Sequence, residues 1–259
     1  MKSLILFDVD GTITDSGYRI KDDMIGLLYR LKNKENIELG ILGGGSYNKH
    51  VEQLGEETLK LFKWTFSENG LVAYKDGELI NNEKITEKIN KTSFNHLVNI
   101  CLNELSKTEN TCKRGNFIQI RNGMINISPI GRDCNQKERE TFFEQDKIFE
   151  YRKKLIEVIK RRWEKYSYES EDDIIELQFT IGGMISIDIF PKGWDKTYCL
   201  DFVKGEYDKI YFLGDNTFEG GNDYEIFNHP LTIGFTVKDT QNTMDIINNQ
   251  FLSDNIFQI

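Results

Sequence analysis

The fold is decided near the start of the chain, in Leu4-Ile5-Leu6-Phe7-Asp8-Val9-Asp10-Gly11-Thr12. An apolar run leads directly into two carboxylates one residue apart, followed by Gly and Thr. A short apolar run before a turn is typical of a buried parallel strand. In open α/β sheets the functional groups gather at the carboxyl ends of such strands, which is where Asp8 and Asp10 fall. Two carboxylates this close repel each other, and a hard divalent cation such as Mg²⁺ would relieve that repulsion.

An ordinary polar turn is the alternative interpretation of this motif, because short Asp/Gly clusters usually form turns. A second strand end favours the functional interpretation. In Phe212-Leu213-Gly214-Asp215-Asn216 another apolar run leads into a carboxylate. If both strands belong to one parallel sheet, Asp215 and Asp8 meet at the same edge and form a carboxylate site for Mg²⁺.

Composition excludes several classes of protein. The chain has 259 residues, enough for one large domain or two modest ones, and a net charge of −9 that argues against nucleic acid as the main partner. No apolar stretch is long enough to predict a membrane span, and the start lacks a signal-peptide layout, so we expect a cytosolic protein. The four cysteines are scattered, which indicates reduced thiols and neither a disulfide framework nor a zinc site.

The remaining patterns predict a chain whose two ends form one domain around an insert. Strand and helix alternate at both ends, which favours a parallel sheet, whereas the middle groups antiparallel strands with long helices. The predicted helices and strands near the ends are a helix around 24–31, a strand at 37–42, a helix over 47–62, a hairpin over 72–80, a helix over 194–203, strands at 210–213 and 231–237, and a helix over 240–251. The middle is predicted to contain helices over 84–106 and 136–165 and hairpins over 117–128 and 174–190.

The expected fold class is therefore α/β, with a Rossmann-like parallel-sheet core of residues 1–81 plus 190–259 and an inserted α+β cap domain of residues 82–189. The first hairpin of the insert has the most specific pattern. Asn122-Gly123 is the preferred two-residue turn, and it pairs Ile120 with Ile125 and Ile118 with Ile127, which makes one face of the hairpin aliphatic.

Two further clusters suggest anion binding. Gly43-Gly44-Gly45-Ser46 follows a predicted strand and opens a helix, where backbone amides and a hydroxyl bind phosphate. In the insert, Arg121, Arg132 and Arg139 fall within one hairpin-plus-helix segment. An Arg in the first turn of a helix opposes the helix dipole, so binding an anion explains Arg139 better than surface stability does.

The insert also offers polar partners for such an anion. In the strand Ile185–Ile189, Ser186 and Asp188 share one face and the isoleucines share the other. Solvated charges on an ordinary amphipathic strand are the alternative, and for any single Arg they are the more common case.

The strand-end motifs resemble those of the haloacid dehalogenase superfamily. Asp8-Val9-Asp10-Gly11-Thr12 is similar to its first motif, whose first Asp attacks a phosphoryl group and whose second Asp is the general acid/base. Gly43–Ser46 fits the second motif, Lys196 stands in the place of the third-motif Lys that neutralises charge, and Gly214-Asp215 with Asp223 nearby fits the fourth. The resemblance therefore implies that the core is of the haloacid dehalogenase type.

Within that superfamily the chain resembles the eukaryotic-type phosphomannomutase family over nearly its whole length. The stretches that carry the resemblance are Phe7–Thr12, Glu68–Gly77, Arg121–Met124, Ser128–Arg132, Gly193–Lys196 and Gly220–Asp223. Members of the family interconvert mannose 6-phosphate and mannose 1-phosphate for GDP-mannose synthesis, with Mg²⁺ and a hexose 1,6-bisphosphate activator. They commonly form homodimers through the cap.

The resemblance implies a role for each candidate residue. Asp8 would be the phosphorylated nucleophile and Asp10 the acid/base, with Lys196 as a third catalytic residue. Mg²⁺ would be held by Asp8, the backbone carbonyl of Asp10, and Asp215. The remaining substrate-binding residues would be Arg121, Arg132, Arg139, Ser186 and Asp188 in the cap, and Arg19, Gly44, Gly45 and Ser46 in the core.

Three departures from the family pattern are visible. Gly17 stands where the family has an Arg in the loop after the first motif, and Arg19 two residues on is the candidate replacement. Gly45 and Ser46 stand where the family has Ser then Asp. A second cation site of the family would involve Phe227 and Thr232, with His229 in place of an acidic ligand.

Two other functions are compatible with parts of the pattern. A sugar-phosphate phosphatase of the same superfamily would use water as the phosphoryl acceptor and has less need for a second phosphate-binding group. A catalytically silent sugar-phosphate-binding protein would have no need for Asp8, Asp10, Lys196 and Asp215 together. The sequence therefore predicts an intramolecular phosphotransferase that acts on hexose phosphates.

Overall fold

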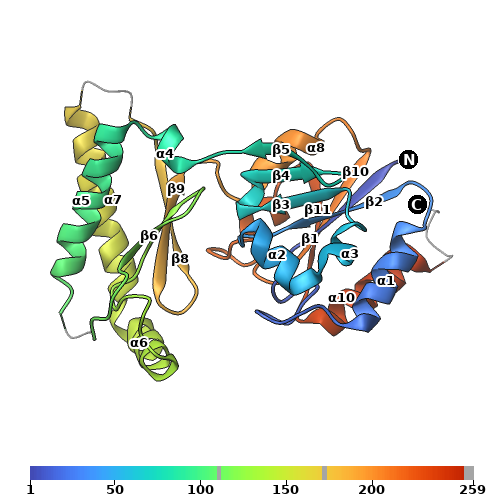
Figure 1. Ribbon diagram of the computed structural model, residues 1–259, viewed down its shortest axis with the longest axis horizontal. Coiled ribbons are helices and arrows are strands. Elements are labelled where there is room, and N and C mark those ends of the chain that lie inside the picture. The colour runs from blue at the N-terminus through green and yellow to red at the C-terminus, as the bar shows by residue number, and fades with distance from the viewer. Residues whose placement is uncertain (110–111, 171–173, 254–259) are drawn as a thin grey trace. The chain divides into compact units, whose positions relative to one another are not determined.

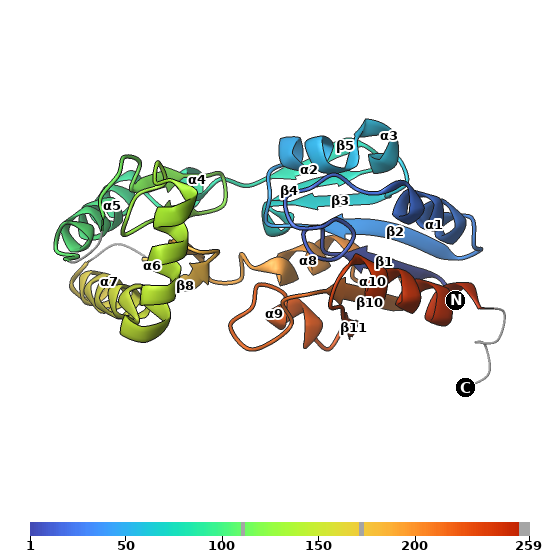
Figure 2. The ribbon, with the colours of Figure 1, turned by 90° about the horizontal axis from the view of Figure 1, so that it is seen from below.

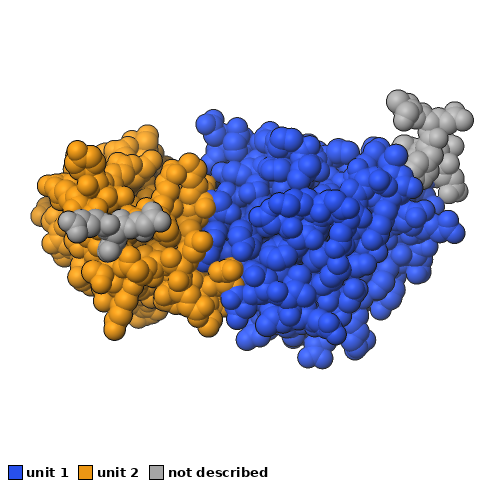
Figure 3. Space-filling model, turned by 90° about the horizontal axis from the view of Figure 1, so that it is seen from above, with its two compact units in different colours: residues 1–82, 193–259 blue, residues 83–192 orange. Residues whose placement is uncertain are grey.

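The computed structural model describes residues 1–109, 112–170 and 174–253. The chain divides into two compact units, one formed by Met1–Asn82 with Gly193–Ile259 and the other by Glu83–Lys192. Figure 3 colours the two units blue and orange. Within the described ranges, no helix combines the length and the apolar character that crossing a membrane requires.

Unit 1 is built on a seven-stranded sheet with the strand order β11-β10-β1-β2-β3-β4-β5 (Figure 1). The first five strands in that order are mutually parallel, and β4 and β5 run antiparallel to their neighbours. The strands are β1 (Ser3–Phe7), β2 (Ile37–Leu42), β3 (Trp64–Ser67), β4 (Val72–Lys75), β5 (Glu78–Asn82), β10 (Lys209–Gly214) and β11 (Thr232–Thr236). The predicted α/β class with a parallel-sheet core is confirmed.

The apolar run of β1 reflects burial on both faces of the sheet. Leu4 and Leu6 join one core cluster, with Phe212 of β10 and Leu200 of a short helix. The alternate residues of β1 join a second cluster with the helices on the opposite face. Since a half-buried strand would show alternating polar residues, the unbroken run predicts the central position that β1 occupies.

The helices predicted over 47–62, 194–203 and 240–251 are shorter in the structure, whereas the helix predicted around 24–31 extends from Asp22 to Lys32. The helices of unit 1 are α1 (Asp22–Lys32), α2 (Tyr47–Leu54), α3 (Glu56–Leu59), α8 (Leu200–Val203), α9 (Tyr224–Phe227) and α10 (Thr240–Ile247), with shorter or irregular turns η1 (Glu68–Gly70), η2 (Lys196–Cys199) and η3 (Asn248–Leu252). The predicted helix over 47–62 is wrong after Leu54, because Gly55 takes φ 78° and starts a new turn. The stretch predicted as one helix over 194–203 is a 3₁₀ turn followed by α8.

Unit 2 combines a four-stranded antiparallel sheet, in the order β6-β7-β9-β8, with helices. Figure 2 labels the helices α4, α5, α6 and α7 of this unit. Its elements are α4 (Ile85–Lys88), α5 (Lys91–Ser106), β6 (Ile118–Ile120), β7 (Ile125–Ile127), α6 (Gln136–Phe149), α7 (Tyr151–Glu169), β8 (Leu177–Gly182) and β9 (Ser186–Pro191). The predicted register of the first hairpin is confirmed, because Ile118 pairs with Ile127 and Ile120 with Ile125. At the start of α6, the Asn135 side chain accepts from the backbone N–H of Glu138, and the Glu138 side chain accepts from the backbone N–H of Asn135.

The two long helices predicted for the insert are each broken once. The helix predicted over 136–165 stops at Glu150, whose left-handed φ of 54° separates α6 from α7. Buried Arg152 stabilises the chain at this break between the helices. Its Nε donates to the carboxylate of Asp146 at 2.7 Å, and its Nη1 donates to the carbonyl of Gly183 at 2.8 Å. The helix predicted over 84–106 restarts at α5, where the Asn90 side chain caps the new N-terminus.

Candidate active site

The sheet brings the two predicted strand ends together. In the parallel ladder between β1 and β10, Phe7 is paired with Leu213, and the backbone N–H of Asp8 donates to the carbonyl of Leu213 at 2.8 Å. Asp8 and Asp215 therefore lie side by side, directly after the carboxyl ends of β1 and β10. One ligand atom of each of Asp8, Asp215 and Asp223 lies within 4.8 Å of the others.

Lys196 is the cation of this cluster and is itself 1% exposed. It donates to Asp8 and also to Asp223, the latter at 2.6 Å. Burial lowers the pKa of Lys196, but the carboxylates of Asp223 and Asp8 outweigh that effect and raise it above the ordinary value. Lys196 is therefore held as an ammonium at the base of the site.

Asp223 contributes more than the sequence suggested, where it appears only as an acidic residue near Asp215. It is fully buried, accepts a hydrogen bond from Lys196, and accepts a second from the backbone N–H of Asn216 at 3.1 Å. Asp223 thus orients Lys196 and the segment that carries Asp215. Its position in Gly220-Gly221-Asn222-Asp223, beside a Gly-Asp strand end, is the pattern that indicates this role.

The charges of the cluster do not balance without a further cation. Three carboxylates and one ammonium leave two negative charges uncompensated in a largely buried place. Burial raises the pKa of Asp8, the charges of Asp223 and Asp215 raise it further, and Lys196 opposes them. Oxygen ligands with this net charge fit a hard divalent cation. Gly11 makes room for the cluster, since a Cβ there would lie 2.5 Å from Oδ2 of Asp215.

Asp10 is half-buried and held separately from the cluster of Asp8. Lys49 donates to its Oδ2, while Gln53 and the backbone N–H of Gly17 both donate to its Oδ1 at 2.8 Å. Burial raises the pKa of Asp10, but these hydrogen bonds outweigh it and leave the pKa below the ordinary value. Lys49 and Gln53 were not predicted from the sequence. Their spacing of four places them on one face of α2, the helix that follows the glycine loop.

The predicted glycine loop connects β2 to α2, and its carbonyls accept backbone hydrogen bonds from the turn that follows β3. The carbonyl of Gly43 accepts from the backbone N–H of Asn69 at 3.0 Å, and the carbonyl of Gly45 accepts from the backbone N–H of Glu68 at 2.9 Å. Both donor residues have left-handed φ values. The Ser46 hydroxyl caps α2 by accepting from the backbone N–H of Lys49 at 3.4 Å. Gly44 is exposed at the tip of the loop.

In unit 2 the three predicted arginines lie close to one another. Arg139 donates to the backbone carbonyl of Arg132 at 2.6 Å, and Arg132 donates to the side chain of Asn126. Burial lowers the pKa of Arg132, and the nearby charges of Arg121 and Arg139 lower it further. Like charges at this separation repel, so the cluster favours an anion.

Asp188 gives the arginines a partial counter-charge. Its carboxylate accepts from Asn126; burial raises its pKa, while that hydrogen bond and the charges of Arg121 and Arg132 oppose the rise. The charges of Arg121 and Arg132 both act on this one carboxylate, which leaves a positive excess that suits a phosphate group. Ser186, also predicted, is buried, and its hydroxyl donates to the carbonyl of Gly182 at 2.9 Å.

Comparison with known proteins places the chain in a family. The family model described as eukaryotic phosphomannomutase matches residues 24–253. Phosphomannomutase 2 of Dictyostelium discoideum is 43% identical over 96% of this chain and 96% of its own. The phosphomannomutase of Galdieria sulphuraria is 43% identical over 93% of this chain and 92% of its own. The chain belongs to the eukaryotic phosphomannomutase family.

Solved structures with the same fold are phosphatases more distant in sequence. A trehalose-6-phosphate phosphatase of Aspergillus fumigatus has a TM-score of 0.56 at 15% identity, covering 96% of this chain and 93% of its own. An IMP-nucleotidase of Plasmodium falciparum has a TM-score of 0.59 at 16% identity, covering 95% of this chain and 67% of its own. At such identities the likeness concerns the fold alone, and it agrees with the predicted α/β class.

Arg19 and the expected second cation site lie at departures from the phosphomannomutase family pattern. Arg19 is exposed on the loop that follows Gly17, and no hydrogen bond or ion pair of its side chain is found in the part of the chain that the structure describes. At the expected second cation site, the Thr232 hydroxyl donates to the carbonyls of Ile226 and His229, the latter at 3.0 Å. His229 Nδ1 accepts from the backbone N–H of Leu231 at 3.2 Å.

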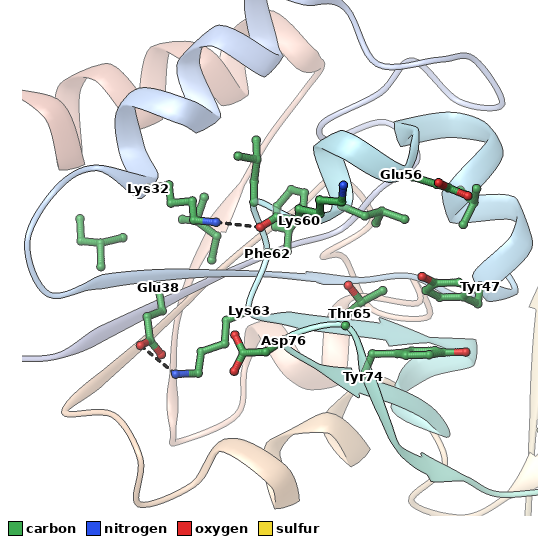
Figure 4. Close-up of a pocket in the computed structure, with 16 residues that line it drawn as sticks. Lys32, Glu38, Tyr47, Glu56, Lys60, Phe62, Lys63, Thr65, Tyr74 and Asp76 are labelled. Atoms are coloured by element: carbon green, nitrogen blue, oxygen red, sulfur yellow. Dashed lines mark hydrogen bonds and ion pairs between the residues drawn. The ribbon is translucent and has the colours of Figure 1, made fainter.

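A cavity of about 570 Å³ lies elsewhere in unit 1, against β2, β3 and β4 (Figure 4). Tyr47 and Tyr74 stack at one end of it, with ring centroids 4.2 Å apart. Lys63 and Glu38 pair at the other end at 3.0 Å. None of the residues predicted for catalysis lines this cavity.

Proposed function

We propose that this chain is a phosphomannomutase, an intramolecular phosphotransferase that interconverts mannose 6-phosphate and mannose 1-phosphate. The observation that supports it most strongly is the presence of two separate groups suited to phosphate. One is the site of Asp8 and Lys196 in unit 1, and the other is the arginine cluster of Arg121, Arg132 and Arg139 in unit 2. A mutase needs both, because its bisphosphate intermediate carries two phosphates at once.

The reaction begins at Asp8, whose carboxylate attacks the phosphorus of hexose 1,6-bisphosphate and forms an aspartyl-phosphate. The bond from that phosphorus to the sugar oxygen breaks, and Asp10 gives its proton to the leaving oxygen. In the second half, mannose 1-phosphate replaces the released monophosphate. Its 6-hydroxyl loses its proton to Asp10 and takes the phosphoryl group from Asp8, which restores hexose 1,6-bisphosphate. The lowered pKa of Asp10 suits the base half of this cycle.

Mg²⁺ fits the carboxylate cluster by charge and by ligand type, as set out above. Asp8, Asp215 and the backbone carbonyl of Asp10 would hold it, with Asp223 anchoring Lys196 behind them. When bound, the ion supplies charge neutralisation for the phosphoryl oxygens. Lys196 adds a second positive charge at Asp8.

The arginine cluster would hold the phosphate that is not being transferred. Each charge-assisted hydrogen bond is worth about 1.5–3 kcal/mol, so several together would hold whichever phosphate is not at Asp8, in either orientation of the sugar. Ser186 and Asp188 would contact the sugar hydroxyls, and Gly44, Gly45 and Ser46 the transferring phosphoryl. We further propose a cytoplasmic homodimer formed through unit 2, whose product feeds GDP-mannose synthesis.

Phosphatase activity, with water as the acceptor, is the second candidate. The clustering of arginines around Asn126 and Asp188 argues for the mutase, because a monophosphate held at Asp8 leaves those arginines without a ligand. The assay that separates the two offers mannose 1-phosphate or glucose 1-phosphate with Mg²⁺ and a hexose bisphosphate. A mutase forms the 6-phosphate in large excess over inorganic phosphate, whereas release of inorganic phosphate alone would refute the proposal.

Arg132→Met is expected to lower kcat/KM for mannose 1-phosphate by about 10- to 100-fold, since it removes one charge-assisted contact to the second phosphate. The proportion of turnovers that end in inorganic phosphate should rise, because weaker binding of the hexose monophosphate leaves the aspartyl-phosphate exposed to water for longer. Both products are measured in one coupled assay. Arg161→Met, on the exposed face of α7, is the matched control and should behave as wild type. An Arg132→Met enzyme with unchanged kcat/KM would exclude the cluster from substrate binding.

A further inference from the structure

The glycine loop lacks a side chain at the position where the phosphomannomutase family pattern has a serine. That position is Gly45. A hydroxyl here would be one of the groups that bind the transferring phosphoryl at the start of α2. The structure shows what lies in this place: a Cβ on Gly45 would be 2.9 Å from Cδ of Lys49 and 3.5 Å from Nε2 of His50.

His50 belongs to α2, and its buried side chain packs against the glycine loop. A Cβ on Gly43 would be 2.6 Å from its Nε2, so the imidazole edge packs directly against the loop backbone and requires glycine there. The side chain is 1% exposed, and its Nδ1 lies 3.0 Å from the hydroxyl of Ser67. Within the described ranges this is the hydrogen bond found for the ring, so Nε2 faces the glycine loop without a partner.

The charges around His50 keep the ring neutral. Burial lowers its pKa to about 4, Lys49 and Lys196 lower it too, and Asp10 opposes them. His50 is thus close enough to Asp10 and Lys196 to feel both charges. A neutral imidazole has one donor and one acceptor nitrogen. If the Ser67 hydroxyl donates to Nδ1, the proton sits on Nε2, and the donor points into the loop.

We propose that His50 binds the transferring phosphoryl group through Nε2–H, in place of the hydroxyl that a serine at position 45 would supply. Ser67 is then the positioning residue that selects the tautomer. This inference rests on the proposed phosphoryl transfer at Asp8. A purely structural histidine is the alternative, and it would explain the contact with Ser67 but not the direction of Nε2.

The first test compares three variants by kcat/KM. His50→Leu combined with Ser67→Ala removes the donor without leaving the Ser67 hydroxyl unpaired, and it should lose about 10- to 100-fold. His50→Gln keeps a donor amide and should stay within a few-fold of wild type. Adding Gly45→Ser to the Leu variant should restore at least tenfold, since the flexible Lys49 side chain can move aside. Equal loss in the Leu and Gln variants, or no loss in either, would overturn the proposal.

Mutase product and inorganic phosphate are both measured in these variants. If wild type only releases phosphate, the mutase proposal fails while the His50 comparison is still made on phosphate release. The second test needs no turnover: ¹⁵N-histidine spectra are recorded with Mg²⁺ as inorganic phosphate is added. The His50 signal should show the Nε2–H tautomer and shift with phosphate, with His96 and His229 as internal controls. An Nδ1–H tautomer, or a His50 signal unmoved at the highest phosphate concentration, would contradict it.

Discussion

Replacing Asp8 with Asn is expected to lower turnover by at least about 10⁴-fold, because an amide cannot form the covalent phosphoryl intermediate. Asp8 lies at the end of β1 and accepts from Lys196, so Asn keeps the shape of the site and removes its nucleophile. The measurement is the rate of 6-phosphate formation from mannose 1-phosphate, together with capture of labelled phosphate on the protein.

The matched control for this variant is Asp201→Asn, which changes a carboxylate on α8 that pairs with Lys204 at 2.6 Å on the surface. It should retain wild-type turnover. An Asp8→Asn enzyme that keeps one per cent or more of the activity would refute the covalent step, whichever acceptor the reaction uses.

Lys196→Met has the second largest expected effect, and it acts on stability as well as on activity. The variant leaves Asp8 and Asp223 buried beside Asp215 without their cation. Breaking a buried ion pair by removing one partner costs about 3–5 kcal/mol. The free energy of unfolding, measured in urea without Mg²⁺, should fall by about that amount at pH 8, and turnover should fall at least about 10³-fold.

The loss of stability should be smaller at pH 5 than at pH 8. Burial and neighbouring carboxylates already raise the pKa of Asp8, and removal of Lys196 raises it further. A carboxyl whose folded pKa is raised binds more protons in the folded state than in the unfolded state. Stability therefore falls as pH rises from the ordinary Asp pKa to the folded one, and it is regained at low pH.

Lys204→Met is the control for this substitution, since it removes an exposed lysine that pairs with Asp201. It should change the free energy of unfolding by less than about 1 kcal/mol at either pH. A Lys196→Met protein as stable as wild type at pH 8, or equally destabilised at pH 5 and pH 8, would contradict the charge balance proposed for the cluster.

The strands were predictable where local pattern and burial agree. The apolar runs of β1 and β10 end in carboxylates, so the meeting of Asp8 and Asp215 followed from the rules of parallel sheets. The Asn122-Gly123 hairpin has a register that the turn type fixes. β3 was missed, although Trp64, Thr65 and Phe66 are typical of strands, because the run is short and bounded by charged residues.

The breaks in the helices depend on contacts that a sequence pattern does not contain. The end of α6 at Glu150 is stabilised by Arg152, which reaches both Asp146 and the β8–β9 turn. Periodicity on either side of Glu150 is helical, so the pattern favoured one long helix. Gly55 is different: a glycine directly after the last turn is a recognised end signal, and it could have been read from the sequence.

The side chains around the predicted site were the least predictable part. Lys49 and Gln53 were not selected, because their function is visible only when α2 brings them to Asp10. The roles of the substrate-binding residues stay predictions, as do those of Arg19, Phe227 and Thr232. For Arg19 the structure offers no contact that indicates a role within its described part.

In the proposed reaction a sugar hydroxyl, and not water, takes the phosphoryl group from Asp8. The most direct test labels the protein with hexose 1,6-bisphosphate that carries radioactive phosphate, removes the excess, and adds unlabelled mannose 1-phosphate with Mg²⁺. We expect the label to move from the protein to hexose bisphosphate and hexose monophosphate in a single turnover. Label recovered as inorganic phosphate, with none on sugar, would contradict it.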